Sequence, residues 1–166
     1  MRNLRKPSNL TQRGAIAVEF AVLLVPLLMI AFGIAEFGRA IYQYNTLAKA
    51  TRDAARFLTT RSPGDAAAHT AAKNMVVYGS ATVTSRALLP GLTTTMVSIC
   101  DSVVATACPG EAHTAVITGA GAINLVTVNV GGVNAIPYVF NFLTPYVSAT
   151  PSINFGRIHV TMQQII

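Results

Sequence analysis

The stretch RGAIAVEFAVLLVPLLMIAFGIA, residues 13–35, decides how the rest of the chain is organised. Its 21 residues from 15 to 35 are apolar except for one carboxylate, Glu19, and one helix-bending residue, Pro26. As a helix with a rise of about 1.5 Å per residue, this run spans roughly 31 Å, which matches the hydrocarbon core of a bilayer. We therefore expect residues 15–35 to form a transmembrane helix.

The charges in front of this run predict its orientation. Residues 1–14 contain four of the chain's 12 Lys and Arg residues and no acidic residue. Such an excess stays on the cytoplasmic side, so everything after Ala35 is expected outside the cytoplasm. Loss of residues 1–14 would lower the formal net charge from +6 to +2. The basic balance therefore gives no reason to expect nucleic acid as a primary partner.

Glu19 is the unusual residue of the run. An ionised side chain costs about 2.5 to 3.5 kcal/mol at the centre of a membrane helix, and less near its end. If the chain is cut between Gly14 and Ala15, the new amino terminus lies one helical turn from Glu19. A carboxylate at this position can then pair with that terminus, whereas in an uncut chain it is a glutamate tolerated at the membrane interface.

Gly14, with a basic residue before it and a glutamate five residues after it, resembles the processing site of type IV prepilins. More narrowly, residues 13–58 resemble the TadE-like minor pseudopilins of tight-adherence (Tad) pili. The resemblance is carried by the Glu19-Phe20 pair, by Pro26 and by the Ala54-Ala55-Arg56 ending.

The resemblance implies a role without catalysis. A prepilin peptidase would cleave the Gly14-Ala15 bond. Glu19 and Phe20 would serve assembly and register, and the Glu19 carboxylate would pair with the α-amino group of Ala15, most usefully that of a neighbouring subunit. The partners would be other pilins and pseudopilins, with the inner membrane before assembly and the pilus or cell surface afterwards. Assembly, priming or tip formation would be the task, and surface adhesion the output of the system. Pro26 would either melt the helix locally for exit from the membrane or form an ordinary kink.

Two other interpretations remain open. Gly33-Ile34-Ala35 has the small-x-small pattern of a signal peptidase site, which would give a Sec-secreted protein that begins at Glu36. The apolar run is longer than the usual 7 to 15 residues of a signal peptide, and it contains a carboxylate. Alternatively, the chain is a permanently anchored single-span protein with a small periplasmic binding or enzymatic domain.

The helical pattern continues beyond the membrane run. Apolar residues recur at alternating spacings of three and four, which predicts one helix from Ala15 to about Thr59. This seam consists of Ile34, Phe37, Ile41, Tyr44, Ala48, Thr51, Ala55 and Leu58, and the opposite face carries Arg39, Lys49, Arg52, Asp53 and Arg56. The predicted divisions are a leader that is disordered or removed (1–14), a transmembrane or filament-core half (15–35), an amphipathic half (36–60) and a globular head (61–166).

The head is predicted as an α+β, pilin-like fold. Ser62-Pro63-Gly64-Asp65 ends the long helix, and Asp65 can cap a second helix over 66–78 that stops at Gly79. The strand candidates are Thr93–Ile99, Leu125–Val130 and Ile158–Met162, joined by a loop over 102–121 and a loop or short helix over 134–147. They predict a small antiparallel sheet packed on the second half of the long helix.

The head's reactive residues predict a disulfide and no catalytic centre. Cys100 and Cys108 lie in the exported part, where a bridge over so short a loop stabilises the fold by roughly 2.5 kcal/mol. Zinc is the rival interpretation, but the two cysteines form no CxxC pair. His69, His113 and His159 share no motif, and His159 is expected to face solvent. We expect no enzyme activity, no metal and no cofactor.

Overall fold

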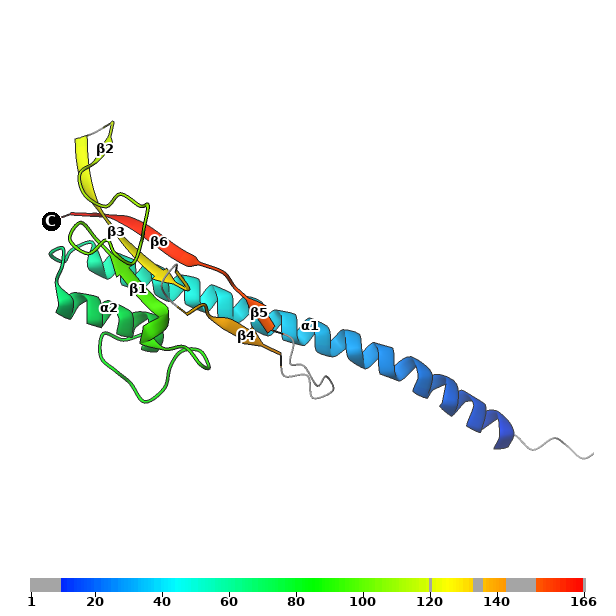
Figure 1. Cartoon of the computed structure of the whole chain (residues 1–166). Coiled ribbons are helices and arrows are strands. Elements are labelled where there is room, and N and C mark those ends of the chain that lie inside the picture. Colours follow the sequence, from blue (N-terminus) through cyan, green and yellow to red (C-terminus); the bar gives the residue numbers. More distant parts are fainter. Residues whose placement is uncertain (1–9, 120, 133–135, 143–151, 166) are drawn as a thin grey trace, which may run out of the picture. The chain divides into compact units, whose positions relative to one another are not determined.

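The computed structural model describes residues 10–119, 121–132, 136–142 and 152–165 (Figure 1). The chain divides into two compact units, an N-terminal unit of residues 1–39 and a C-terminal unit of residues 40–166. The elements are α1 (Leu10–Leu58), α2 (Ala66–Tyr78), the 3₁₀ helix η1 (Thr94–Met96), β1 (Val97–Cys100), β2 (Val116–Thr118), β3 (Gly121–Val130), β4 (Val139–Asn141), β5 (Ser152–Asn154) and β6 (Ile158–Gln164). The predicted α+β fold is confirmed.

Helix α1 is continuous over 49 residues and ends one residue before the predicted end. Its start differs from the prediction, because it begins at Leu10 rather than Ala15. The predicted leader is thus helical from Leu10 onward, and residues 1–9 lie outside the described part. Residues 10–14 contain no proline, so nothing in the local sequence stops the helix from extending backward.

The buried face of α1 in the C-terminal unit lies one position away from the predicted seam. Ala40, Gln43 and Leu47 are buried, whereas Ile41 and Tyr44 are exposed. From Thr51 onward the predicted seam residues Thr51, Ala55 and Leu58 are buried as expected. The seam residues Ile34 and Phe37 of the N-terminal unit are also exposed. The apolar pattern was misleading at 40–47 because that stretch buries a small residue and an amide. The amide of Gln43 is satisfied, since the Tyr138 hydroxyl donates to its Oε1 at 2.8 Å.

Helix α2 has the predicted boundaries, and both of its ends are capped. The Asp65 carboxylate accepts hydrogen bonds from the amides of Ala67 (2.9 Å) and Ala68 (3.2 Å). At the other end Gly79 adopts a left-handed conformation with φ of 72°, and its amide donates to the Met75 carbonyl. Glycine takes this conformation without the steric cost of a side chain, which is why the helix stops there.

Strand β3 is the centre of a four-stranded antiparallel sheet (Figure 1). It pairs with β1 through residues 127–130, with β6 through residues 124–130, and with β2 through residues 121–123. Because side chains alternate along a strand, Val126, Val128 and Val130 face one side, and Thr127 and Asn129 face the other. All five are buried, so both faces of this part of β3 are covered.

The apolar face of the sheet packs on helices. The core combines α1, α2, β1, β3 and β6, with these buried residues among its members: Leu47, Ala54, Ala55, Leu58, Ala68, Ala72, Val76, Val77, Val97, Ile99, Val126, Val128, Val130 and Ile158. The prediction that the sheet packs on the second half of the long helix is therefore correct.

The structure also corrects several predicted segments. The first part of the strand predicted at Thr93–Ile99 is η1, and the strand itself is β1. The predicted loop over 102–121 contains β2, and β3 begins at Gly121 rather than Leu125. In the segment over 134–147, β4 pairs with β5, while residues 134–135 and 143–147 lie outside the described part. Strands of three residues are too short to show a recognisable alternation.

The cap of α2 gives the first prediction. Asp65→Ala removes the acceptor of two backbone amides and should lower the free energy of unfolding of the C-terminal unit by about 1 kcal/mol. Asp65→Asn should retain most of it. Urea unfolding of the full chain in detergent, followed by near-ultraviolet circular dichroism, measures the effect. Asp53→Ala, which removes an exposed aspartate within α1, is the control. An Asp65→Ala chain as stable as the parent would show that the cap contributes nothing.

Candidate functional site

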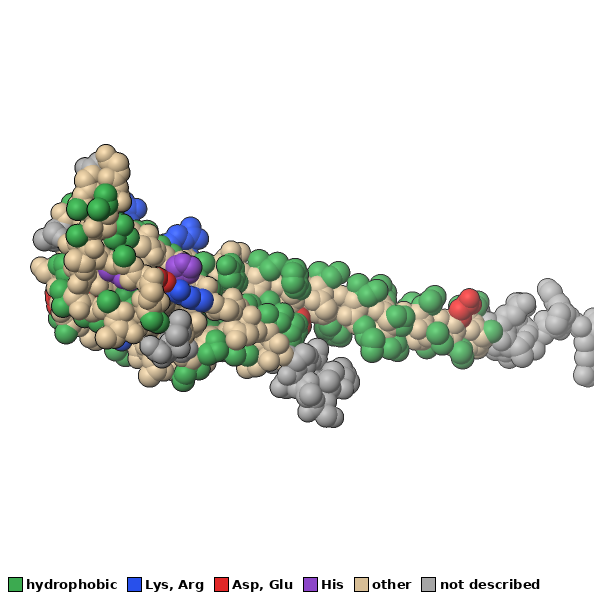
Figure 2. All heavy atoms as spheres, turned by 45° about the horizontal axis from the view of Figure 1, so that its top comes forward, with side chains coloured by type: hydrophobic (Ala, Val, Ile, Leu, Met, Phe, Trp, Pro, Cys, Tyr) green, Lys and Arg blue, Asp and Glu red, His purple; other side chains and the backbone are tan. Residues whose placement is uncertain are grey.

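The part of α1 in the N-terminal unit exposes large apolar side chains all along its length. Figure 2 shows apolar side chains along the face that is in view. Apart from Leu24, which is partly buried, its large apolar residues between 16 and 34 are 43–70% exposed. A helix with apolar side chains on all faces is normally found in lipid or packed among other helices, because exposing so much apolar surface to water is energetically unfavourable. Within the described residues, α1 is also the one helix that is long and apolar enough to cross a membrane.

The predicted processing residues lie inside this helix. Gly14 does not break α1, and a side chain added to it would meet nothing within 4 Å. The Gly14-Ala15 bond therefore lies in the second turn of α1, and a peptidase would have to unwind that turn to reach it.

Glu19 and Phe20 are both exposed on α1. Glu19 lies four residues after Ala15, so the two share one face of the helix. Among the described residues, Glu19 has no hydrogen-bond or ion-pair partner. Its carboxylate is thus free to bind a cation from outside the chain.

Pro26 lies within α1, and the helix continues through it. Because proline has no backbone N–H, the carbonyl four residues earlier, that of Val22, loses its helical hydrogen bond at this point. The ladder of backbone hydrogen bonds is therefore weakest within the apolar part of the helix.

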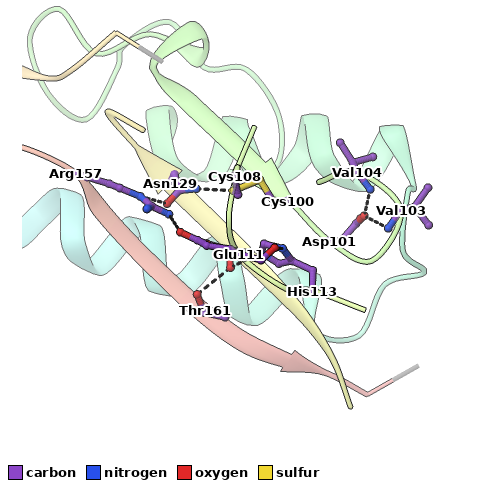
Figure 3. Close-up of a disulfide and its surroundings, with 11 residues drawn as sticks. Cys100, Asp101, Val103, Val104, Cys108, Glu111, His113, Asn129, Arg157 and Thr161 are labelled. Carbon is purple, nitrogen blue, oxygen red and sulfur yellow. Dashed lines mark hydrogen bonds and ion pairs between the residues drawn. A yellow bond between two sulfur atoms is a disulfide. The ribbon is translucent and has the colours of Figure 1, made fainter. Parts of the chain in front are cut away.

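In the C-terminal unit, the predicted disulfide is present. Cys100 at the end of β1 is bonded to Cys108, with 6.2 Å between their Cα atoms. Figure 3 shows the loop after β1 crossing the polar face of the sheet, with Cys108 beside Asn129. Asn129 Nδ2 donates to Cys108 Sγ at 2.9 Å. The disulfide thus fixes the loop that covers the polar residues of β3.

His113 continues this cover and is buried. Its Nδ1 lies 3.1 Å from the Glu111 carbonyl, which can only accept, so Nδ1 carries the hydrogen. In the neutral ring, Nε2 then accepts from the Thr127 hydroxyl at 2.9 Å, and Thr127 lies 2.8 Å from the hydroxyl of Thr161. These bonds satisfy the polar groups that the loop and β3 bury together.

Arg157 closes the network from the other side. Its Nε donates to Asn129 Oδ1 at 3.0 Å, and its guanidinium forms an ion pair with Glu111. The sequence did not single out Arg157 or Glu111. The two partners of Arg157, Asn129 and Glu111, lie 28 and 46 positions away from it in the chain.

The comparison with protein families concerns the helix described first. A family model for TadE-like protein matches residues 14–56. This stretch is a TadE-like segment. The TadE-like resemblance predicted over residues 13–58 is therefore confirmed over residues 14–56. No curated protein and no solved structure matches the chain.

The TadE-like segment contains Gly14, Ala15, Glu19, Phe20 and Pro26, and it ends at Arg56. It covers α1 nearly to its end and includes no residue of α2 or of the sheet. The family match therefore gives no information about the head, and only the structure describes it.

Cys108, Glu111 and His113 place potential metal ligands within 4.8 Å of one another. However, the sulfur of Cys108 is bonded to Cys100, so it offers no thiolate while the disulfide holds. The carboxylate of Glu111 is already paired with Arg157. The arrangement is explained as a structural network that holds the loop.

Asp101, directly after Cys100, is fully buried and joins distant parts of the C-terminal unit. Four donors bind its two oxygens: the amides of Gly64 (2.7 Å), Val103 (2.9 Å) and Val104 (2.7 Å), and Nε2 of His69 (2.8 Å). Burial alone would raise the pKa of Asp101, but these hydrogen bonds outweigh it and hold the pKa below its ordinary value of 3.8. The hydrogen bonds from the Val103 and Val104 amides are local, and they form the kind of turn that an aspartate side chain commonly makes with the backbone just after it. The bonds from Gly64 and His69 depend on the tertiary fold.

His69 therefore does have a partner in the fold, and so does His113, although their sequence positions share no motif. His159 on β6 is exposed, as predicted.

The Asp101 network predicts a pH-dependent stability. Since the folded pKa lies below the ordinary value, the contribution is complete at neutral pH and is lost as the pH falls below about 3.8 toward the folded pKa. Asp101→Asn places an amide against donors and should cost about 2 kcal/mol at pH 7. This deficit relative to the parent should shrink at pH 3. Urea unfolding at both pH values measures it, with Asp53→Asn as the exposed control. An equal deficit at both pH values would contradict the role of the carboxylate charge.

Proposed function

We propose that this protein is a structural minor pseudopilin of a Tad-type pilus, cleaved after Gly14 by a prepilin peptidase. The observation that carries the proposal is the TadE-like match from Gly14 to Arg56, with Glu19 one helical turn beyond the proposed cut. The apolar surface of the N-terminal part of α1 supports a place in the inner membrane and then among the helices of other pilins.

Cleavage would create the cation that Glu19 lacks. The new α-amino group of Ala15 is positively charged at neutral pH, because its pKa is about 7.7 to 8.0 in unperturbed chains. In a filament core, where water is excluded, separating such a pair would leave a buried charge unpaired, at a cost of about 3 to 5 kcal/mol. Pairing between the Ala15 amine of one subunit and Glu19 of the next therefore gives the subunits a defined register.

The position of the cut within α1 bears on how cleavage occurs. Gly14 and Ala15 lie in the second turn of α1, so the peptidase acts on a locally unwound end of the helix. The cytoplasmic N-terminus and the periplasmic head follow from the basic residues before the apolar run. After assembly the head lies on the pilus, where it serves assembly, priming or tip formation, and surface adhesion is the output of the system.

The size of the C-terminal unit favours a minor component. Residues 40–166 form a compact body with its own core and disulfide. A major pilin of such a system would need little more than the helix. The proposal includes no catalytic step, and the buried side chains of Asp101, His113 and Thr127 are used in hydrogen bonds within the head.

The mature N-terminus tests the processing step. Intact-mass measurement of the protein from its native host should show loss of residues 1–14 and a chain that begins at Ala15. A chain that begins at Glu36 would instead identify a signal peptidase product, and one that retains residues 1–14 a permanently anchored protein. Gly14→Leu, which enlarges the residue before the cut, should block processing.

Glu19 tests the assembly step. Glu19→Ala should leave export and cleavage largely intact and strongly reduce incorporation into sheared pili. Glu19→Gln should be similarly defective, because it keeps the shape but removes the charge. Val18→Ala, a change at the neighbouring exposed position, is the matched control. Quantitative immunoblots of pilus and membrane fractions measure both, and normal incorporation of Glu19→Ala would refute the register role.

A further inference from the structure

The C-terminal unit exposes apolar side chains where the chain enters it. They lie on the first two turns of α1 in this unit and on the β4–β5 ribbon, and they are 36–69% exposed. We name them the apolar belt: Ile41, Tyr42, Tyr44, Val139 and Ile153. The Tyr44 ring contacts Phe155, just after β5, with 5.6 Å between ring centroids, which joins the helix and the ribbon in one surface.

The ribbon is held firmly against α1. Phe155 also packs on Phe140 and Tyr138, with centroid distances of 6.1 and 5.8 Å. Tyr138 donates to Gln43 of α1 at 2.8 Å. Figure 1 shows the ribbon alongside α1, and the β2–β3 hairpin at the far end of the sheet. A two-stranded ribbon is marginal by itself in water, so these contacts keep the belt in place.

The sequence around the ribbon is devoid of charge. Between Glu111 and Arg157 the chain contains no Asp, Glu, Lys or Arg. Water-exposed surfaces normally intersperse both signs of charge, and an exposed apolar patch without them marks an interaction surface.

The length of the chain indicates what covers the belt. Ile41 follows the end of the apolar run, Ala35, by six residues of unbroken helix, or about 9 Å. The headgroup layer extends about 5 to 8 Å beyond the hydrocarbon core on each side. Six residues of helix therefore bring the start of the belt within a side-chain length of this layer.

The residue types fit that layer. Tyrosine is enriched at membrane interfaces, because its ring is apolar and its hydroxyl binds water or headgroups. Tyr42 is the most exposed member of the belt and Tyr44 is half-exposed. An uncharged surface also avoids the cost of bringing charged side chains against acyl chains.

We propose that the apolar belt lies in the headgroup layer of the bilayer that α1 crosses, so that the head docks on the membrane surface before assembly. The occupant of this surface is a phospholipid bilayer, and the proposal rests on the membrane location assumed in the proposed function. Docking by Val139 and Ile153 fixes the head on the membrane. Extraction of the subunit into a filament then has to remove the belt from lipid as well as the apolar part of α1.

Tryptophan fluorescence tests the docking, since the chain contains no tryptophan. Single variants Ile153→Trp, Val139→Trp and Tyr42→Trp place the probe in the belt. Ile117→Trp is the matched control, because Ile117 is 88% exposed on β2, away from the belt. The full chain is reconstituted in phosphatidylcholine vesicles, and flotation first establishes insertion. Quenching is then measured with iodide in the water and with phosphatidylcholine brominated near the headgroup.

Docking predicts severalfold weaker iodide quenching at Tyr42→Trp and at one or both ribbon positions than at Ile117→Trp, together with clear quenching by brominated lipid. Iodide quenching of both ribbon probes equal to that of Ile117→Trp, without an effect of bromine, would overturn the proposal and leave the pseudopilin function intact. Protection without bromine quenching that disappears at low protein-to-lipid ratio would assign the belt to a second copy, and would also overturn it. Failure of the chain to float with vesicles would refute the membrane location itself.

Discussion

One continuous helix has to satisfy two different surroundings, and this constraint shapes the rest of the chain. Up to Arg39, α1 exposes large apolar side chains on all sides, and its backbone hydrogen bonds are made within the helix. Apart from the Val22 carbonyl opposite Pro26 and the N–H groups of the first turn, the backbone groups of this segment have their partners within the helix, so the segment is stable without water. From Ala40 onward the same helix buries a narrow row that begins with small or polar residues and ends with Leu58.

A second constraint acts on the head. Its central strand is buried on both faces, so the polar side chains on one face need hydrogen-bond partners within the protein. The valines of β3 face helices and need only apolar contact, whereas Thr127 and Asn129 need hydrogen bonds. The loop after Cys100 supplies them through His113 and Cys108, and the disulfide lowers the entropy that the loop loses on folding. The disulfide and the polar network therefore act together: both hold the loop that covers the polar face of the sheet.

The sequence predicted what depends on neighbours along the chain. Asp65 and Gly79 set the ends of α2 by local hydrogen bonds, and the alternation in residues 125–130 and 158–162 identified the two long strands. The TadE-like resemblance was recognisable because the residues that carry it, Gly14, Glu19 and Pro26 among them, lie close together in the sequence.

What depends on distant residues was not predictable. The buried face of α1 was misplaced because Gln43 is satisfied only by Tyr138, 95 positions away. The three-residue strands β2, β4 and β5 carry too few side chains for a period to appear. Asp101 and His69 come together only when the sheet packs beside α2. In each case the missing information is tertiary contact rather than local preference.

Under the proposed function, the carboxylate of Glu19 is costly in one state and useful in another. Glu19 has no partner among the described residues, and in the uncut chain the Gly14-Ala15 peptide bond carries no charge. Under the proposed function, cleavage creates an amine on the same helical face, one turn away. In lipid next to water this amine and Glu19 remain hydrated, and their attraction is weak. In a filament core without water the same attraction is strong, because few other groups can screen it. The energetic cost of Glu19 in the membrane then becomes a preference for the assembled state, which a neutral residue at this position would not provide.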